Sequence, residues 1–229
     1  MRKTILCLAN SYKHGGRCVA GVCIDDGKWI RLRGRAADGA LQPDEYALDD
    51  GSEPRLLDLI QVELHCALPS GSHPEDWQIA PTCWQLVERP ASNPRWAAMT
   101  GEDGKSKAIL LDHRDRIAAW ELKYKPVKSS LCLVCPTEIY WWIREGRIRQ
   151  DKGKRKYRAL FHRNYVTYDF AVTDPRWLDQ LNLLPAGIYP HSTFAPAAAE
   201  TWLTISLSEA YFGFHYKLVA AVIVRDGAI

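Results

Sequence analysis

The sequence lacks the long apolar runs that membrane-spanning and exported proteins carry. No stretch of its 229 residues approaches the ~18 consecutive apolar residues needed to cross a bilayer. The apolar run from Thr4 to Leu8 is too short for the core of a signal peptide and is soon followed by Asn10, Ser11 and Lys13. These absences predict a cytoplasmic protein without a membrane partner.

An excess of charge of one sign is also missing. The formal net charge is only +3, and such a weak charge does not separate a nucleic-acid-binding protein from any other soluble protein. Any argument for nucleic acid therefore depends on where the basic residues lie.

The cysteines form neither a disulfide framework nor a complete metal site. Seven cysteines, an odd number in a chain without an export signal, indicate reduced thiols. Cys132 and Cys135 have the spacing of half a zinc site, but no second such pair and no close histidine pair stands near them. We therefore expect thiols that face a core, with no metal and no cofactor.

Polar aromatic rings are abundant. The chain has nine Trp and ten Tyr but only five Phe, and rings with a polar group can stack on bases or line a pocket. Packing in a core is the alternative for each ring. Apolar residues at 47% and charged residues at 25% are typical of a folded globular protein.

Short strand patterns separated by turn signals run through most of the chain. The first of them, Thr4–Leu8, Cys18–Ile24 and Trp29–Leu32, are predicted to form a meander around the turn Asp25–Gly27. Further strands are predicted at Leu56–Leu68, Leu131–Cys135, Glu138–Ile143, Leu160–Val172, Trp202–Leu207 and Tyr216–Val224, and a short helix at Arg176–Leu183. This pattern predicts a mainly β fold with a few short helices, arranged as small β-barrels.

The chain length favours two modules. Apolar residues between Pro94 and Glu121 have helical spacing and interrupt the strand patterns. We therefore place the domain junction in or after this segment. The predicted domains are residues 1–125, an N-terminal barrel with a helical insertion, and residues 126–229, a C-terminal barrel.

Several motifs resemble the bacterial dual OB-domain family, at both ends of the chain. They are Ile5–Ser11, Gly16–Gly21 and Trp29–Arg31 near the start, and Tyr168–Pro175, Ser206–Ser208 and Tyr216–Ala220 towards the end. One departure is that the first group continues as Leu-Arg-Gly-Arg up to Arg35, where a strand-ending residue is expected.

The resemblance implies two OB-like barrels in tandem and recognition of nucleic acid or nucleotides in bacterial DNA modification and defence. The sequence is also similar to the component of the 7-deazaguanine DNA-modification pathway that converts the cyano group of the inserted base to an amide. The first similarity predicts a binding protein. The second would make the protein an enzyme.

Basic residues gather in three places that suit a phosphate backbone. The stretch from Arg144 to Arg158 is predicted as a long hairpin connection, and contacts of its cations with phosphates would release counterions. Arginines alternate from Arg31 to Arg35 on a predicted strand, and the glycine loop Lys13–Cys18 offers amide groups to an anion. A solvated loop and a plain turn are the alternatives. The candidate nucleic-acid-binding residues are Lys13, Arg17, Arg31, Arg33, Trp141, Trp142, Arg147, Arg149, Lys154, Arg155 and Lys156.

An enzyme would need a nucleophile, and the glycine loop offers one. Cys18 is the candidate nucleophile and His14 the candidate base, with a core thiol as the alternative for Cys18. Lys217 enters an apolar strand, so its ammonium needs an anionic partner or a cleft. Asp174 is either that partner or the cap of the next helix. The cluster from Asp112 to Asp115 is either an acid–base pair or a solvated helix start.

The sequence thus predicts a protein that binds nucleic acid, with DNA as the expected form, together with other proteins of a modification or defence system. The first alternative is an enzyme that hydrates the nitrile of a 7-cyano-7-deazaguanine base in DNA. The second alternative is a protein-interaction or sensor subunit. The sequence leaves open whether the protein is catalytic.

Overall fold

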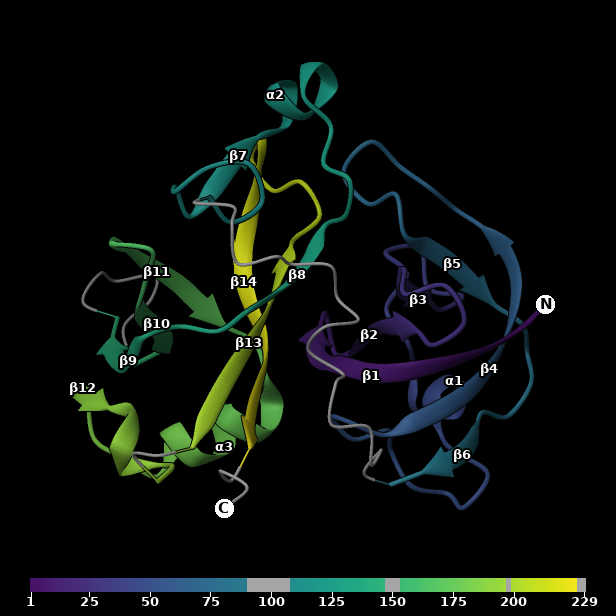
Figure 1. The fold of residues 1–229 in the computed structure, drawn as a ribbon, viewed down its shortest axis with the longest axis horizontal. Coiled ribbons are helices and arrows are strands. Elements are labelled where there is room, and N and C mark those ends of the chain that lie inside the picture. Colours follow the sequence, from purple (N-terminus) through teal and green to yellow (C-terminus); the bar gives the residue numbers. More distant parts are fainter. Residues whose placement is uncertain (90–107, 147–152, 197–198, 226–229) are drawn as a thin grey trace.

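A computed structural model describes residues 1–89, 108–146, 153–196 and 199–225. Strands dominate it, and they form two units that lie side by side, with β1, β13 and β14 between them (Figure 1). None of the helices in these residues is long and apolar enough to cross a membrane.

The first unit is a closed barrel of five strands. Its strands follow the order β1-β2-β3-β5-β4, and β4 pairs with β1 to close the circle. Neighbouring strands are antiparallel except β3 and β5, which are parallel. The bounds are β1 Arg2–Lys13, β2 Gly16–Cys23, β3 Trp29–Arg33, β4 Leu59–Ala67 and β5 Asp76–Ile79, with the added edge strand β6 Gln85–Glu88 and the helix α1 Pro43–Tyr46.

The second unit has the same strand order as the first barrel, except that β8 and β9 together take the place of its first strand. The order is β12-β9-β10-β11-β14-β13-β8, and β11 and β14 are parallel. β12 is an added edge strand at one end of this order, next to β9. Only Cys135, Pro136 and Thr137 separate β9 from β8 at the other end, so the sheet curls back on itself. Proline lacks the amide donor that a continuous strand needs.

The elements of the second unit have these bounds. The strands are β7 Arg116–Ala118, β8 Leu131–Val134, β9 Glu138–Glu145, β10 Arg155–Arg163, β11 Val166–Val172, β12 Gly187–Pro190, β13 Glu200–Leu207 and β14 Phe214–Arg225. The helices are α2 Ala119–Tyr124 and α3 Pro175–Asn182, with a 3-10 turn at His191–Thr193.

These two barrels confirm the mainly β fold class. The strand expected over Leu160–Val172 is instead a hairpin, β10 and β11, that turns at Asn164 and Tyr165. Both turn residues have positive φ, 49° and 65°. Such a turn is favoured by Asn followed by Gly, and Tyr165 gives no such signal. Half of the predicted helical patch, residues 94–107, lies outside the described residues. In its described half, residues 119–121 belong to α2, whereas Arg116–Ala118 forms β7 instead of a helix.

The described strands of the first barrel end at Glu88. β7 pairs with β14, so residues 116–118 extend the second sheet, although the predicted division at 125/126 assigns them to the first domain.

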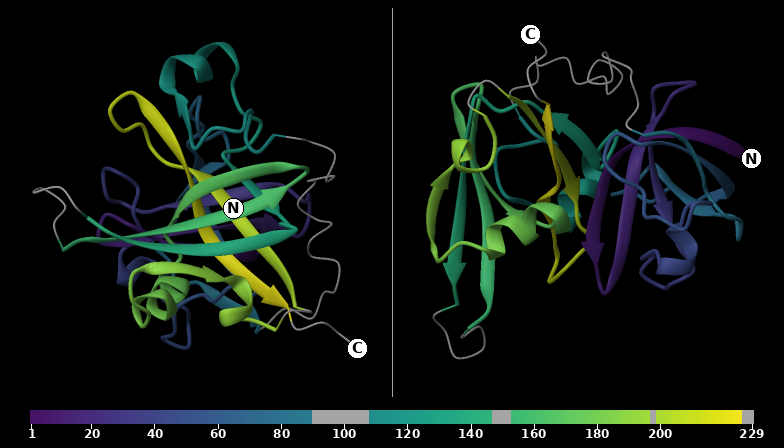
Figure 2. Two further views of the ribbon diagram at one scale, coloured as in Figure 1. Left: turned by 90° about the vertical axis from the view of Figure 1, so that its left-hand side faces the viewer. Right: turned by 90° about the horizontal axis from the view of Figure 1, so that it is seen from below.

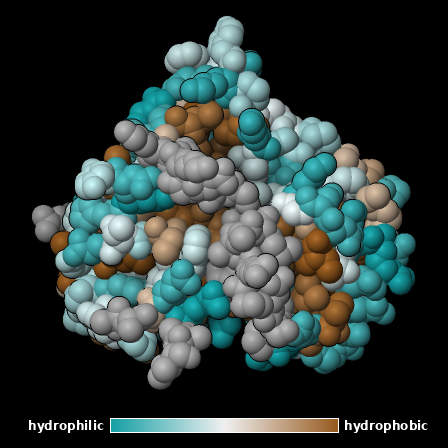
Figure 3. Space-filling model, viewed as in Figure 1, coloured by the Kyte–Doolittle hydropathy of each residue, from teal (hydrophilic) through white to brown (hydrophobic). Residues whose placement is uncertain are grey.

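A shared apolar layer joins the two barrels. Outer side chains of β1 and β2, including Leu6, Leu8 and Val22, pack against Leu133 and Ile223 of the second unit, and all are buried. The amide of Tyr12 also donates to the carbonyl of Thr173 at 3.0 Å. Figure 3 shows apolar residues only in small patches among hydrophilic ones on the face that it presents. The two barrels therefore pack as one unit, and these contacts hold the residues on both sides of the junction in place.

Candidate functional site

A pocket of about 330 Å³ lies at this junction, and we call it the junction pocket. The end of the β1–β2 hairpin forms one wall, and the connection from β13 to β14 forms the other. Tyr12, Tyr211 and Tyr216 contribute rings, and Leu207 and Leu218 contribute apolar surface. The volume and the mixture of rings with a few polar groups are typical of small-molecule sites.

Two small polar side chains sit next to each other in the pocket. Ser11 on β1 is the cross-strand partner of Cys18 on β2, and both line the pocket. Ser11 is 5% exposed, and no residue in the described part of the chain forms a hydrogen bond with its hydroxyl. A hydroxyl both donates and accepts, so this group can pair with either kind of polar atom on a ligand in the pocket.

A charge network links the two barrels beside the pocket. Arg31 is buried and donates to Asp76 from Nε at 2.6 Å and from Nη2 at 2.8 Å. Glu209, from the second unit, accepts from Arg33 at 2.6 Å and from Lys13 at 3.3 Å. Three cations against two carboxylates leave the network with a net positive charge.

The network holds Glu209 ionised. Burial raises the pKa of Glu209, but His73, Arg33, Arg31 and Lys13 lower it more, to about 2. Burial lowers the pKa of Arg31, yet its hydrogen bonds to Asp76 and the negative charge of Cys18 when that thiol is ionised reverse this effect, so the pKa of Arg31 is raised overall. The predicted arginine track is thus an ion-pair network, and its acidic members were not found from the sequence.

The glycine loop is a two-residue turn at the mouth of the pocket. His14 and Gly15 have φ of 45° and 85°, and glycine tolerates the second value without strain. The imidazole of His14 is exposed, lines the pocket and bonds to Asp38 at 2.6 Å. The structure therefore brings together Lys13, His14, Cys18 and Arg31 among the predicted site residues.

Lys217 lies outside this pocket. Its neighbours Tyr216 and Leu218 line the pocket, and side chains alternate along a strand, so Lys217 points to the other face of β14. Its Nζ donates to the carbonyl of Asp112 at 2.8 Å and to Oδ1 of Asp112 at 2.7 Å. Burial lowers the pKa of Lys217 despite this partner.

Asp174 is the cap of α3. Its Oδ1 accepts from the amides of Arg176 and Trp177, and its Oδ2 accepts from the amide of Val222 at 2.8 Å. Burial raises the pKa of Asp174, against the effect of these hydrogen bonds. The anionic partner of Lys217 is therefore Asp112, and Asp174 has the capping role that the sequence left open.

A second candidate surface is the outer side of the β9–β10 hairpin, which lies in front in the left view of Figure 2. Alternation turns Trp142 and Arg144 outward on β9, and Lys156 lies opposite Arg144 on β10. The guanidinium of Arg144 lies 4.3 Å from the centre of the Trp142 ring. We call Trp142, Arg144 and Lys156 the basic face.

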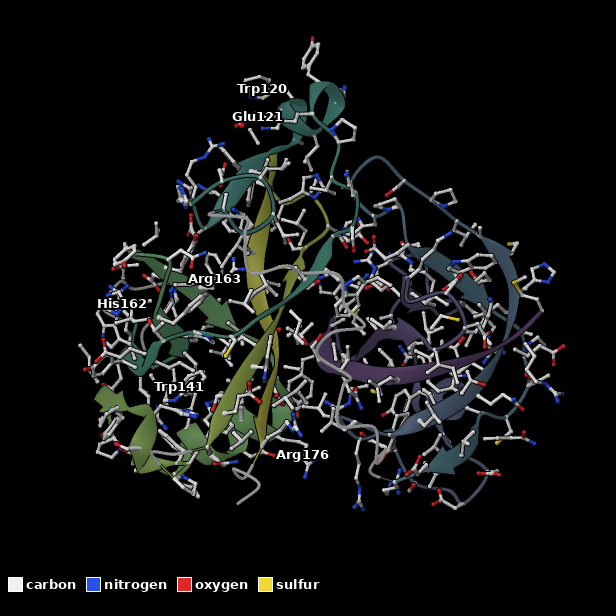
Figure 4. The ribbon with its side chains drawn as sticks, viewed as in Figure 1. Trp120, Glu121, Trp141, His162, Arg163 and Arg176 are labelled. Atoms are coloured by element: carbon white, nitrogen blue, oxygen red, sulfur yellow. The ribbon has the colours of Figure 1, made fainter. Side chains whose placement is uncertain are left out.

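Other predicted nucleic-acid-binding residues have structural partners. Trp141, labelled in Figure 4, lies in the second unit. It is fully buried, donates from Nε1 to His191 at 3.1 Å and packs on Trp177. Arg155 donates to the carbonyls of Asn182 and Leu184 and so ties the hairpin to the end of α3. Lys154 is exposed on the hairpin, and Arg147 and Arg149 lie outside the described residues.

Metal ligands do not gather in the described part of the chain. No group of three or more His, Cys, Asp or Glu side chains there could hold a metal ion. Cys132 is buried whereas Cys135 is exposed, so the two thiols of the predicted half-site differ in environment.

Comparisons with known proteins relate the chain to one family. The family model described as the dual OB-containing domain matches residues 3–222. A search of curated proteins found no match.

Similar solved structures share little sequence with the chain. A murine DNA-binding protein bound to double-stranded DNA is 10% identical, with 99% of this chain and 98% of that chain covered and a TM-score of 0.33. The p204 HINb domain is 11% identical, with 96% of each chain covered and a TM-score of 0.33. These similarities are too distant to assign a ligand to the chain.

Proposed function

Because the chain belongs to the dual OB-containing domain family, we propose that it is a nucleic-acid-binding protein of a bacterial DNA-modification or defence system. The observation that carries this proposal is the basic face, where an outward-facing tryptophan lies beside two cations on neighbouring strands. Phosphates bind to the cations, and an unpaired base stacks on the ring.

The ring makes single strands the preferred ligand. A base within a duplex is already stacked on its neighbours, whereas an unpaired base offers its face to Trp142. Side chains on one face of a strand repeat about every 7 Å, so Trp142 and Arg144 contact adjacent parts of one strand of nucleic acid. The resemblance to DNA-modification proteins supports DNA as the ligand and other proteins of such a system as partners.

Removing the ring is expected to weaken single-strand binding about fivefold. Base stacking on an aromatic side chain contributes ~1 to 3 kcal/mol, and we expect the lower end because Arg144 already covers part of the ring. Fluorescence anisotropy with labelled single-stranded and duplex DNA measures the affinity of Trp142→Ala. The same affinity as wild type would remove the ring from the proposal.

A charge variant tests the phosphate contacts. Arg144→Ala with Lys156→Ala should lower the slope of log affinity against log salt by about 1.4, roughly 0.7 for each phosphate of a single strand. The matched control is Lys123→Ala with Lys125→Ala, which removes the same charge from exposed positions at α2. Figure 4 shows Trp120 and Glu121 of this helix at the top of the molecule, away from the hairpin. Equal slopes for both variants would exclude the basic face, and no affinity for any nucleic acid would favour a protein-interaction subunit.

A second candidate function is hydration of the nitrile of a 7-cyano-7-deazaguanine base. It rests on Cys18 and His14, which line the junction pocket together, with His14 held by Asp38 at 2.6 Å. A nucleophile, a base and a third group that orients the base are the parts that covalent catalysis needs.

The chemistry balances with water alone. The thiolate of Cys18 adds to the nitrile carbon while the nitrogen takes up a proton that His14 transfers, which gives a thioimidate. Water then adds to the same carbon, and cleavage of the C–S bond returns the thiol and releases the amide. Lys217 and Asp174, which the sequence offered as further catalytic residues, have no place in this scheme, because neither lines the pocket.

Mass spectrometry tests this candidate. DNA that carries the cyano base should gain the mass of one water with the wild type and with Cys66→Ser, an exposed thiol on β4, but not with Cys18→Ser. An active Cys18→Ser variant would rule out the thiolate step. No gain of mass with the wild type would rule out this function and leave the binding role.

A further inference from the structure

A second pocket of about 440 Å³ lies at the junction of the barrels, and three arginines from separate segments line it. Arg17 comes from β2, Arg55 from the segment before β4, and Arg176 from the first turn of α3. Figure 4 shows Arg176 near the junction of the two barrels. We call this the arginine pocket.

Two buried polar atoms of this pocket have no partner. Nη1 of Arg17 and Oδ1 of Asn10 are both buried, and neither forms a hydrogen bond with any described residue. The amide nitrogen of Asn10 donates to the carbonyl of Pro54 at 2.9 Å, which fixes the oxygen as the unpaired atom. A donor and an acceptor therefore lie unsatisfied in one pocket, and such groups are costly unless a ligand pairs with them.

The carboxylates of the pocket are already engaged. Glu53 accepts from Nη2 of Arg17 at 3.1 Å and from the hydroxyl of Tyr46 at 3.2 Å. Asp174 accepts from three backbone amides. In the described residues, the exposed side chains of Arg55 and Arg176 form no hydrogen bond or ion pair. Their charges are thus available to an anion.

We propose that the arginine pocket binds a hydrogen phosphate group. The guanidinium groups donate to the phosphate oxygens, as arginine does in many phosphate sites. Oδ1 of Asn10 accepts the hydrogen of the P–OH group, a contact that sulfate cannot make because it carries no proton near neutral pH. This site is separate from the basic face and from the junction pocket, so it stands independently of both proposed functions.

Isothermal titration with inorganic phosphate at constant ionic strength tests the site. We expect saturable binding of one phosphate per chain, at least fivefold weaker binding in Arg176→Gln and in Arg55→Gln, and none in the double variant. Both side chains are exposed, so these variants should keep the fold. The control Arg2→Gln, an exposed arginine near the start of β1, should bind as the wild type does.

The alternatives give different results. No saturable binding, equal loss in Arg2→Gln, or unchanged binding in the double variant would overturn the site. Equal affinity for sulfate would overturn the assignment to hydrogen phosphate. A nucleoside 5′-monophosphate that binds more tightly than inorganic phosphate, with the same dependence on Arg176, would identify the source as a terminal phosphate, and weaker binding would identify free phosphate.

Discussion

Replacing Asp76 with alanine is expected to lower the free energy of unfolding by about 3 to 5 kcal/mol. Arg31 and Asp76 are 2% and 4% exposed, and two short hydrogen bonds join them. Without the carboxylate, the ion pair that the buried guanidinium keeps among the described residues is the one with Glu209, at 3.4 Å. An uncompensated charge in the interior is costly because water cannot reach it. Urea unfolding followed by tryptophan fluorescence and circular dichroism measures the loss.

An exposed ion pair provides the control for this prediction. Arg35 and Asp44 lie 2.6 Å apart but are 67% and 68% exposed, so Asp44→Ala should cost less than about 1 kcal/mol. The double variant Arg31→Met, Asp76→Leu removes both charges and should recover most of the stability that Asp76→Ala loses. If Asp76→Ala and Asp44→Ala unfold alike, the buried pair does not stabilise the junction.

Acidification from about pH 7 to about pH 5 should destabilise the wild type by about 2 kcal/mol through His73 alone. His73 is 1% exposed, and burial together with the nearby Arg31 lowers the pKa of His73 from 6.5 to about 4. Its Nε2 lies 3.1 Å from the carbonyl of Leu207, so the neutral ring donates there. Between the two pKa values the unfolded chain binds a proton that the folded chain does not, and stability therefore falls as the pH falls through this range.

A glutamine in place of His73 separates this histidine from other titrating groups. The glutamine amide can still donate to Leu207 but does not titrate, so His73→Gln should show a flatter dependence of unfolding free energy on pH. The exposed His65 on β4 is the matched control, and His65→Gln should keep the wild-type slope. Glu209 does not interfere, because its low pKa confines the loss of its contribution to pH values between its usual pKa of 4.5 and about 2. Parallel slopes for all three proteins would show that His73 is not the responsible group.

Local sequence patterns predicted most of the strands, because a strand is indicated by alternating apolar and polar residues and by the turn residues at its ends. β1, β2 and β3 lie where the meander was expected, and β8, β9, β13 and β14 also fall on predicted strands. α3 begins at Pro175 after its cap Asp174, as the Asp-Pro signal indicates. The sequence did not predict the β10–β11 turn, because Tyr165 adopts a positive φ that its residue type does not favour.

The candidate site was predictable only where its residues lie on one hairpin. His14 and Cys18 share the end of the β1–β2 hairpin, so their proximity follows from a short turn. Arg33 meets Glu209 across 176 positions of sequence, and Lys217 meets Asp112 across 105. Such pairs depend on how the barrels pack. Arg31 is buried beside Glu209 of the other barrel, and Trp141 is buried in the core of the second barrel, although their residue types alone suggested exposed contacts with nucleic acid.

The apolar layer between the barrels makes the chain indivisible. A fragment that ends after the first barrel would leave Leu6, Leu8 and Val22 facing water, and the complementary fragment would leave Leu133 and Ile223 uncovered. Each half would then expose an apolar surface and aggregate. The two halves are therefore expected to stay in solution only when both are present to cover each other.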